Sequence, residues 1–443
     1  MDQYGELPRE IPLDVLEYII ELASEDRRHN ERKKTLLSCT LVCRAWVTKS
    51  RIYLYRRIVL FRQQKATKFI DTVTSSPLLG EYVQSLLFAP SYEDMNWVST
   101  VHRVLPTFLP NVHFLIYDRL PPYQSPFVAL ASGFKNVTCL VLRYPNSRWT
   151  FQQVARLLNG FPKLKMLQTI GVDMETDPFD DPKPSPQDTG ATSFHLRCIS
   201  GYTTFSIAED ALLWLSKRQS SHTLNELWVD CDKISAQSQN FVRVLRQCSG
   251  TLESLRISFY EIGSWDTGEN EDPSNLMLET TWIPVIASCS NLGRFEMLSP
   301  RSSKESILFL ELLFSHLPSS LHSIGLHFDA EEVFSEDSRG FWETIDTTLT
   351  SNKFPKLNYF ELIGGAYLIR LHNQGVFKEF LPNLYKQGIL WCTSLSRDFR
   401  YPIKPSTHTL PPDDFEAWGR LACITPFPGW EDCHPEDEDP YLS

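Results

Sequence analysis

The sequence lacks the long apolar runs of membrane proteins and the leader of secreted ones. Its most apolar stretch, residues 307–317, contains Glu311, Ser315 and His316, whereas a helix that spans a bilayer needs about 20 mainly apolar residues. The N-terminus has no basic start followed by an apolar core, so no secretory signal is visible. We therefore expect no membrane association and residence in the cytoplasm, the nucleus or both.

Paired cysteines are also lacking. The ten cysteines stand singly within apolar segments, which is typical of reduced, buried thiols. Cys423 with Cys433 and His434, and Cys39 with Cys43, lack the second pair of ligands that a structural zinc site needs. We expect neither disulfides nor a bound metal.

Motifs for catalysis and nucleotide binding are missing as well. The sequence contains no Gly-x-Ser-x-Gly, no Gly-x-x-x-x-Gly-Lys and no Gly-x-Gly-x-x-Gly. The single cysteines stand in no recognisable active-site setting. We expect no enzymatic activity and no cofactor, although a catalytic site of an unrecognised kind stays open as an alternative.

Positive charge is scarce except in one stretch. The net charge of -11 argues against nucleic-acid binding, because phosphate binding needs a basic surface. Residues 27–68 are the exception, with thirteen Lys or Arg residues and one acid, Glu31. Three acidic segments, at 173–193, 264–275 and 329–339, follow expected strands. They are interpreted as solvated loops or, alternatively, as an acidic rim that favours a basic target.

What the sequence does contain is a repeated six-residue pattern, apolar-x-x-apolar-x-apolar. Successive copies start 25 to 40 residues apart. The eight clear copies begin at Val83, Val112, Val137, Leu224, Leu252, Leu292, Leu321 and Leu357, and two weaker ones at Leu164 and Leu196. Amphipathic helical stretches lie between them, at 149–159, 207–218, 238–248 and 304–317.

A unit of one strand and one helix cannot bury its own apolar face, so such units must stack. This arrangement resembles a leucine-rich-repeat solenoid, with parallel strands on the concave side and helices on the convex side. The Asn or Cys ladder of that family is missing, and the corresponding positions hold Pro145, Asp232, Tyr260 and Asp329. We therefore expect an irregular α/β solenoid.

The first fifty-five residues predict short helices instead. Pro8 and Glu10 favour a helix start, and apolar residues at helical spacing follow at Ile11, Val15, Ile19 and Leu22. A second helix is expected through Leu36, Cys39, Cys43, Trp46 and Ser50, and a third over 50–57. Residues 24–34 are polar and are interpreted as a loop or a helical extension. So small a unit cannot hide all its apolar residues, which need either a partner or the next domain to cover them.

Two motifs in this region carry a resemblance to a known family. Leu7-Pro8-Arg9-Glu10-Ile11 is followed by Leu36-Leu37-Ser38-Cys39 and by Leu41-Val42-Cys43-Arg44-Ala45-Trp46, with Tyr53-Leu54-Tyr55 behind them. In this order they resemble the F-box, and with the repeats they resemble the leucine-rich F-box proteins, especially the large divergent families of fungi. The connection 23–35 is longer than the usual link between the first two helices of an F-box.

The resemblance implies docking onto the S-phase-kinase-associated adaptor and, through it, onto a cullin. We expect adaptor contacts at Leu7, Pro8, Ile11, Val15, Leu37, Leu41, Val42, Cys43, Trp46 and Leu54. The adaptor is acidic in this family, so the basic stretch would steer its approach.

The predicted organisation is an F-box at 1–60, a substrate-binding repeat domain at 61–420 and an acidic flexible tail at 421–443. The expected function is substrate recognition for a Skp/cullin/F-box ubiquitin ligase. Action with the adaptor outside a ligase, or as a plain repeat scaffold, stays open. The target and the residues that contact it are not predicted beyond the concave side and its edge.

Overall fold

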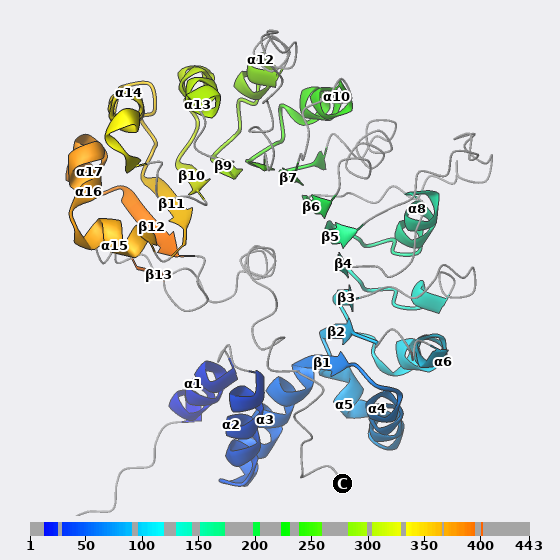
Figure 1. The fold of residues 1–443 in the computed structure, drawn as a ribbon. Helices are drawn as coiled ribbons and strands as arrows, with labels where there is room; N and C mark the ends of the chain where they lie inside the picture. The colour runs from blue at the N-terminus through cyan, green and yellow to red at the C-terminus, as the bar shows by residue number, and fades with distance from the viewer. Residues whose placement is uncertain are drawn as a thin grey trace, which may run out of the picture. The chain divides into compact units, whose positions relative to one another are not determined.

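The fold is taken from a computed structural model (Figure 1). It describes residues 13–24, 29–90, 96–118, 130–143, 151–172, 198–203, 223–230, 239–258, 282–298, 304–328, 334–365, 367–394 and 400–401. These residues form two compact units, unit 1 up to Val137 and unit 2 from Thr138 onward. No helix in these ranges is both long and apolar enough to cross a membrane.

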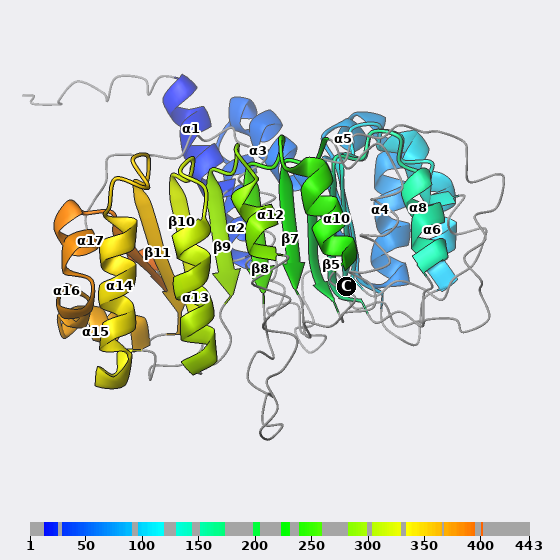
Figure 2. The ribbon, with the colours of Figure 1, turned by 90° about the horizontal axis from the view of Figure 1, so that it is seen from above.

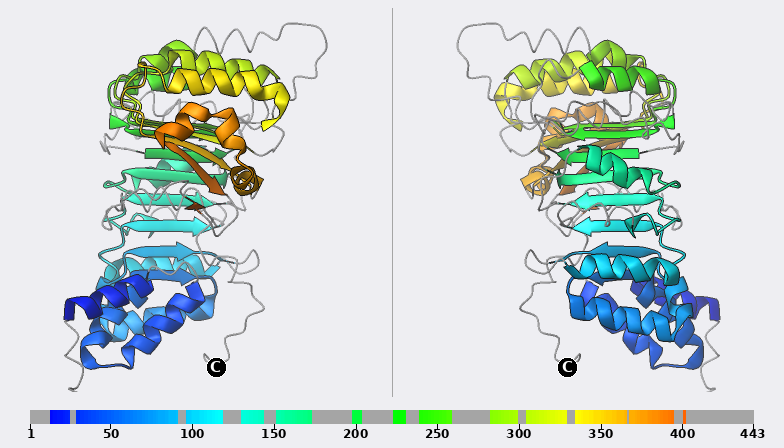
Figure 3. Two further views of the ribbon diagram at one scale, coloured as in Figure 1. Left: turned by 90° about the vertical axis from the view of Figure 1, so that its left-hand side faces the viewer. Right: turned by 90° about the vertical axis from the view of Figure 1, so that its right-hand side faces the viewer.

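Unit 1 begins with three helices that pack on one another (blue in Figure 3). They are α1 (Leu13–Ser24), α2 (His29–Thr40) and α3 (Arg44–Arg56). Their shared core consists of Ile20, Leu36, Cys39 and Tyr53. An ion pair also joins α3 to α1, because Lys49 Nζ donates to Glu17 Oε2 at 2.9 Å.

The chain turns where the sequence predicts a continuous second helix. The helix α2 ends at Thr40, and the Leu41 N–H donates to the Ser38 carbonyl oxygen at 3.0 Å. Cys43 has extended backbone angles, which a helix cannot continue through. The expected helix over residues 36–50 is therefore wrong: two helices meet at this turn, and α3 also covers most of the expected third helix.

Three parallel strands complete unit 1: β1 (Arg57–Leu60), β2 (Ser85–Phe88) and β3 (Phe114–Asp118). The helices α4 (Gln63–Ser75), α5 (Pro77–Glu81) and α6 (Asn96–Phe108) connect them. The strand β1 starts at the residue after α3, and Arg56 Nε donates to Gln84 Oε1 at 2.9 Å. The helical bundle is thus joined to the strands without a linker.

Unit 2 contains strands that pair in the order of the sequence. They are β4 (Cys139–Arg143), β5 (Met166–Val172), β6 (Cys198–Thr203), β7 (Glu226–Asp230), β8 (Ser254–Ser258), β9 (Arg294–Leu298), β10 (Ser323–Phe328), β11 (Tyr359–Gly364), β12 (Leu390–Ser394) and β13 (Arg400–Tyr401). The strands β4 to β12 are parallel, and β13 is antiparallel to β12.

Helices cover one face of these strands, as Figure 2 shows for β7 to β11. Those described are α8 (Phe151–Asn159), α10 (Gln239–Cys248), α12 (Ile283–Ala287), α13 (Lys304–His316), η6 (Glu336–Ser338), α14 (Arg339–Leu349), α15 (Tyr367–Asn373), α16 (Val376–Phe380) and α17 (Pro382–Gln387). Alternate strand residues such as Leu255 and Ile257 are fully buried, which matches a strand face packed beneath helices.

The prediction of an α/β protein with parallel strands is confirmed. All ten copies of the sequence pattern coincide with strands, β2 to β11. Three strands were missed. The strand β1 lies in the region assigned to helices, the pattern fails at β12 because Gln387 stands where its first apolar residue belongs, and β13 has only two residues. The helix expected at 207–218 lies outside the described residues.

A buried histidine makes the stability of unit 1 depend on pH. His102 on α6 donates from Nδ1 to the Val98 carbonyl oxygen at 2.7 Å, and the Tyr117 hydroxyl donates to Nε2 at 2.6 Å. The second bond requires a neutral ring, because Nε2 accepts a hydrogen bond only when it carries no proton. Burial lowers the pKa of His102 to about 4.

We predict that the unfolding free energy falls as the pH drops from about 6.5 to about 4, by up to about 3 kcal/mol. Over that range the unfolded chain binds a proton that the folded chain excludes. Urea unfolding at several pH values would measure this, and His102→Gln should flatten the slope. The exposed His316 provides the control His316→Gln; equal slopes for His102→Gln and the wild type would contradict the prediction.

Candidate interaction surfaces

The helix α1 is apolar on two sides. Ile20 points into the bundle core. Large apolar side chains on the other side are exposed, namely Val15, Tyr18, Ile19 and Leu22. Their spacing of three and four residues places them on one face of the helix, which we call the α1 face.

A second exposed apolar group lies at the turn between α2 and α3. Leu41 is 87% exposed and Val42 is 61% exposed, and Leu37 and Cys43 beside them are exposed as well. We call these four residues the Leu41 turn. A short turn that presents adjacent Leu and Val side chains to solvent is unfavourable in isolation, because each loses the stabilisation that burial would provide.

The concentration of these residues is unusual within the described chain. Of its eight exposed large apolar side chains, seven lie between Val15 and Val42, and the other is Leu78. Scattered exposed apolar residues are normal, whereas a gathering of them marks an interaction surface.

The structure divides the ten expected adaptor contacts into three groups. Val15 lies on the α1 face, and Leu37, Leu41, Val42 and Cys43 form the Leu41 turn. Trp46 and Leu54 are half-buried against the bundle core. The remaining three, Leu7, Pro8 and Ile11, lie outside the described residues.

Some exposed residues were not among the expected contacts. The sequence already placed Ile19 and Leu22 at helical spacing with Val15, and this spacing could have identified them as contacts. No sequence signal identified Tyr18. Ile20, on the opposite side of α1, is buried in the bundle's own core. Exposed basic residues of the predicted basic stretch accompany these surfaces, with Lys34 on α2 and Arg44 and Arg51 on α3.

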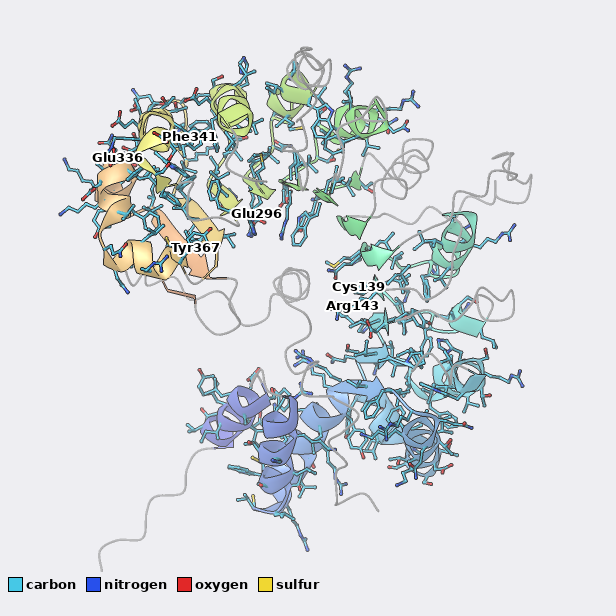
Figure 4. The ribbon with its side chains drawn as sticks, viewed as in Figure 1. Cys139, Arg143, Glu296, Glu336, Phe341 and Tyr367 are labelled. Carbon is cyan, nitrogen blue, oxygen red and sulfur yellow. The ribbon has the colours of Figure 1, made fainter. Side chains whose placement is uncertain are left out.

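Unit 2 carries a different kind of surface on the strand face away from the helices. Strand pairing aligns one residue from each of β5 to β12 in a row: Gln168, Ser200, Trp228, Arg256, Glu296, Gly325, Glu361 and Trp391. We call it the polar row. Figure 4 shows Glu296 pointing away from the helices, as do Cys139 and Arg143 of β4.

Glu296 is the centre of a charged cluster. It is 3% exposed. Arg294 donates from Nε to Glu296 Oε1 at 2.6 Å, and Arg256 Nη1 lies 3.6 Å from Oε2. Arg256 also stands over the ring of Trp228, 5.3 Å from its centroid. Burial alone would raise the pKa of Glu296, but the two guanidinium groups outweigh it and lower the pKa, so the carboxylate stays charged.

His327 borders this cluster as a neutral group. Its Nε2 lies 4.0 Å from Glu296 Oε2, and burial lowers the pKa of His327 to about 3. At neutral pH this contact is therefore not an ion pair. Gly325 of β10 lies in the row between Glu296 of β9 and Glu361 of β11. The absence of a side chain on Gly325 leaves room for the Glu296 side chain, because a Cβ on Gly325 would lie 3.0 Å from Glu296 Cγ.

Several polar atoms of this face are buried without a hydrogen-bond partner. They are Gln168 Nε2, Trp228 Nε1, Glu296 Oε2 and His327 Nε2. An unpaired buried polar atom costs about 1–3 kcal/mol. The cost is concentrated on one face of the sheet.

The sequence did not identify these residues, although a signal existed. Each member of the row from β5 to β11 occupies the variable position between the last two apolar residues of the repeated pattern. Two of the predicted acidic segments, 173–193 and 264–275, lie outside the described residues. In the third, the described part contains an exposed ion pair between Arg339 and Glu336 at 2.7 Å. The cysteine and histidine set at 423–434 also lies outside them.

Comparison with protein-family models gives no match, and comparison with curated proteins gives none either.

We predict that Glu296→Ala destabilises unit 2 by about 3 kcal/mol, because it leaves two guanidinium groups without their shared carboxylate. Chemical unfolding followed by tryptophan fluorescence would measure the loss. The control is Glu336→Ala, which removes an exposed Glu–Arg pair and should leave the unfolding midpoint unchanged. Equal midpoints for the two variants would contradict the prediction.

Proposed function

We propose that the chain is a substrate-recognition subunit of a Skp/cullin/F-box ubiquitin ligase, which binds the S-phase-kinase-associated adaptor through its N-terminal helices. The observation that carries this proposal is the exposed Leu41 turn. It falls within the sequence Leu41-Val42-Cys43-Arg44-Ala45-Trp46, where the resemblance to the F-box expects contacts with the adaptor.

The shape of the bundle supports the same proposal. Three helices hold a core of only a few residues and keep Val15, Ile19 and Leu22 outside. A partner that covers these side chains would gain about 1.5–3 kcal/mol for each one fully buried. Lys34, Arg44 and Arg51 would add attraction to an acidic partner.

The second part of the proposal is that the strand and helix units form a divergent leucine-rich-repeat solenoid that binds a protein target. Its support is the sequential pairing of parallel strands, together with the helices that the structure describes after β4, β7, β8, β9, β10 and β11. Arrays of this kind form extended concave surfaces that can bind a partner. On this proposal the chain performs no chemistry itself, and its partners catalyse the transfer.

The junction of α3 and β1 bears on how the adaptor would be held. Because Arg56 ends the helix and Arg57 begins the strand, an adaptor bound to the bundle would be fixed relative to β1, β2 and β3. A rigid attachment of this kind suits a complex that must hold a target in a defined place.

We predict that the double substitution Leu41→Asp and Val42→Asp lowers co-purification of the adaptor at least about tenfold, since two charges would be buried at the contact. Both side chains are exposed, so the fold should survive. Leu78→Asp, at the exposed apolar residue of α5 in the same unit, is the matched control.

The same purification distinguishes the alternatives. Recovery of adaptor and cullin with the wild-type chain supports the ligase. Adaptor without cullin would mean action outside a ligase, and recovery of neither would leave a repeat scaffold. Unchanged adaptor recovery with the Leu41 and Val42 variant would refute the docking assignment.

A further inference from the structure

The exposed side of α3 carries positive charge that nothing in the described part of the chain neutralises. Arg44, Thr48 and Arg51 are exposed, and their spacing of four and three residues places them on one face of the helix. We call these three residues the α3 face. Neither arginine forms an ion pair with a residue that the structure describes, whereas Lys49 of the same helix is paired with Glu17 at 2.9 Å.

The α3 face adjoins the exposed Leu41 turn, because Arg44 directly follows Cys43. A ligand that covers both surfaces must combine apolar side chains, which would bury Leu41 and Val42, with negative charge for the arginines. Carboxylates suit this role, since a guanidinium group can bind a carboxylate through two parallel hydrogen bonds. An acidic and partly apolar segment of the chain itself would therefore compete with an acidic adaptor.

One segment of the chain has this composition. Residues 431–439 contain six acidic residues and no lysine or arginine. Phe427 and Trp430 precede the acidic run, and Tyr441 and Leu442 follow it. The segment 427–442 lies outside the described residues, and its match to the surface rests on this combination of charge and apolar side chains.

We propose that the segment 427–442 binds the Leu41 turn and the α3 face of its own chain and thereby competes with the adaptor. The inference rests on the proposed function and deepens it, because it names a regulator of adaptor binding. Acidic side chains of the segment pair with Arg44 and Arg51, and its aromatic side chains cover Leu41 and Val42. The adaptor binds only when the segment has left, which lowers the apparent affinity of the chain for the adaptor.

The spacing of the charges fits this contact. Arg44 and Arg51 are about 10.5 Å apart along the helix axis, at about 1.5 Å per residue. In an extended segment, Glu436 and Asp439 are about 10 Å apart, at about 3.3 Å per residue. Two carboxylates can therefore meet the two guanidinium groups without a bend in the segment.

The chain is long enough to bring the segment back to its N-terminal helices. Tyr401 is the last described residue. Residues 402–426 can extend over at most about 90 Å, whereas a compact unit of about 270 residues has a radius of gyration of about 19 Å. Attachment to the same chain also raises the local concentration of the segment, so weak contacts suffice.

The acidic segment 264–275 is the competing occupant within the chain. It carries four acidic residues, against six in 431–439, and one aromatic residue, Trp265. It also lies between two described elements, β8 and α12, which limits its reach. The segment 427–442 combines more negative charge with more apolar surface.

The test first measures the contact without the adaptor. The receptor is the full chain in which the six acidic residues of 431–439 are replaced by their amides, called the tail-neutral variant, so that its own segment does not compete. The probe is a fluorescein-labelled peptide of residues 427–442, and a labelled peptide of residues 264–275 serves for comparison.

Two pairs of substitutions in the tail-neutral variant locate the contact. Arg44→Gln with Arg51→Gln removes the charge of the α3 face. The matched control is Arg243→Gln with Arg246→Gln, since both of these arginines are exposed on α10 of unit 2. All four side chains are exposed, so the urea midpoint should be the same for every variant.

We expect fluorescence anisotropy to show binding of the 427–442 peptide to the tail-neutral variant. The affinity should fall about five- to tenfold with the α3 pair and stay unchanged with the α10 pair. Raising the salt concentration from about 0.1 M to about 1 M should weaken binding, because the screening length falls from about 10 Å to about 3 Å. In a second titration, the adaptor should bind the tail-neutral variant about three- to tenfold more tightly than the wild-type chain.

Equal peptide affinity with and without the α3 pair would overturn the proposal. Tighter binding of the 264–275 peptide would do so as well, and so would equal adaptor affinity for the wild-type chain and the tail-neutral variant. The peptide titration is independent of the adaptor. Peptide binding without adaptor recovery would refute the ligase function and leave the contact, and adaptor recovery without peptide binding would refute the contact alone.

Discussion

The packing of short strands beneath helices is the interaction on which the strand-bearing part of the chain depends. Alternate residues of the strands whose side chains are described, such as Leu255 and Ile257 of β8, are buried on the helical side. One strand with one helix has too little apolar surface to be stable alone. Neighbouring units supply the missing cover, which is why the strands pair in sequence order and why the intervals between them can vary without breaking the sheet.

The other strand face has a different composition. Its residues are charged or polar at several positions, including Arg256, Glu296 and His327, and they are buried nonetheless. Burying charges is costly unless they are paired, and the cluster around Glu296 meets that condition only in part.

The N-terminal bundle leaves part of its apolar surface exposed. It is too small to bury all its apolar residues, and its core takes Ile20 and Leu36 while Leu41 and Val42 stay in solvent. The two surfaces would therefore be stabilised by different interactions. Burial of apolar groups away from water would stabilise the Leu41 turn, and completed hydrogen bonds would stabilise the polar row. Under the proposed function, the Leu41 turn would hold the adaptor.

The sequence by itself determined the ten strands β2 to β11 and the class of the fold, because a short strand that buries alternate residues produces the repeated pattern locally. It also pointed to Leu41 and Val42 through their motif. Tertiary structure alone decided which side of α1 faces inward, since apolar residues occupy both sides, and where the helix breaks before Cys43. Only strand register brings Arg256 beside Glu296, forty residues apart in sequence, because pairing of distant segments leaves no local signal.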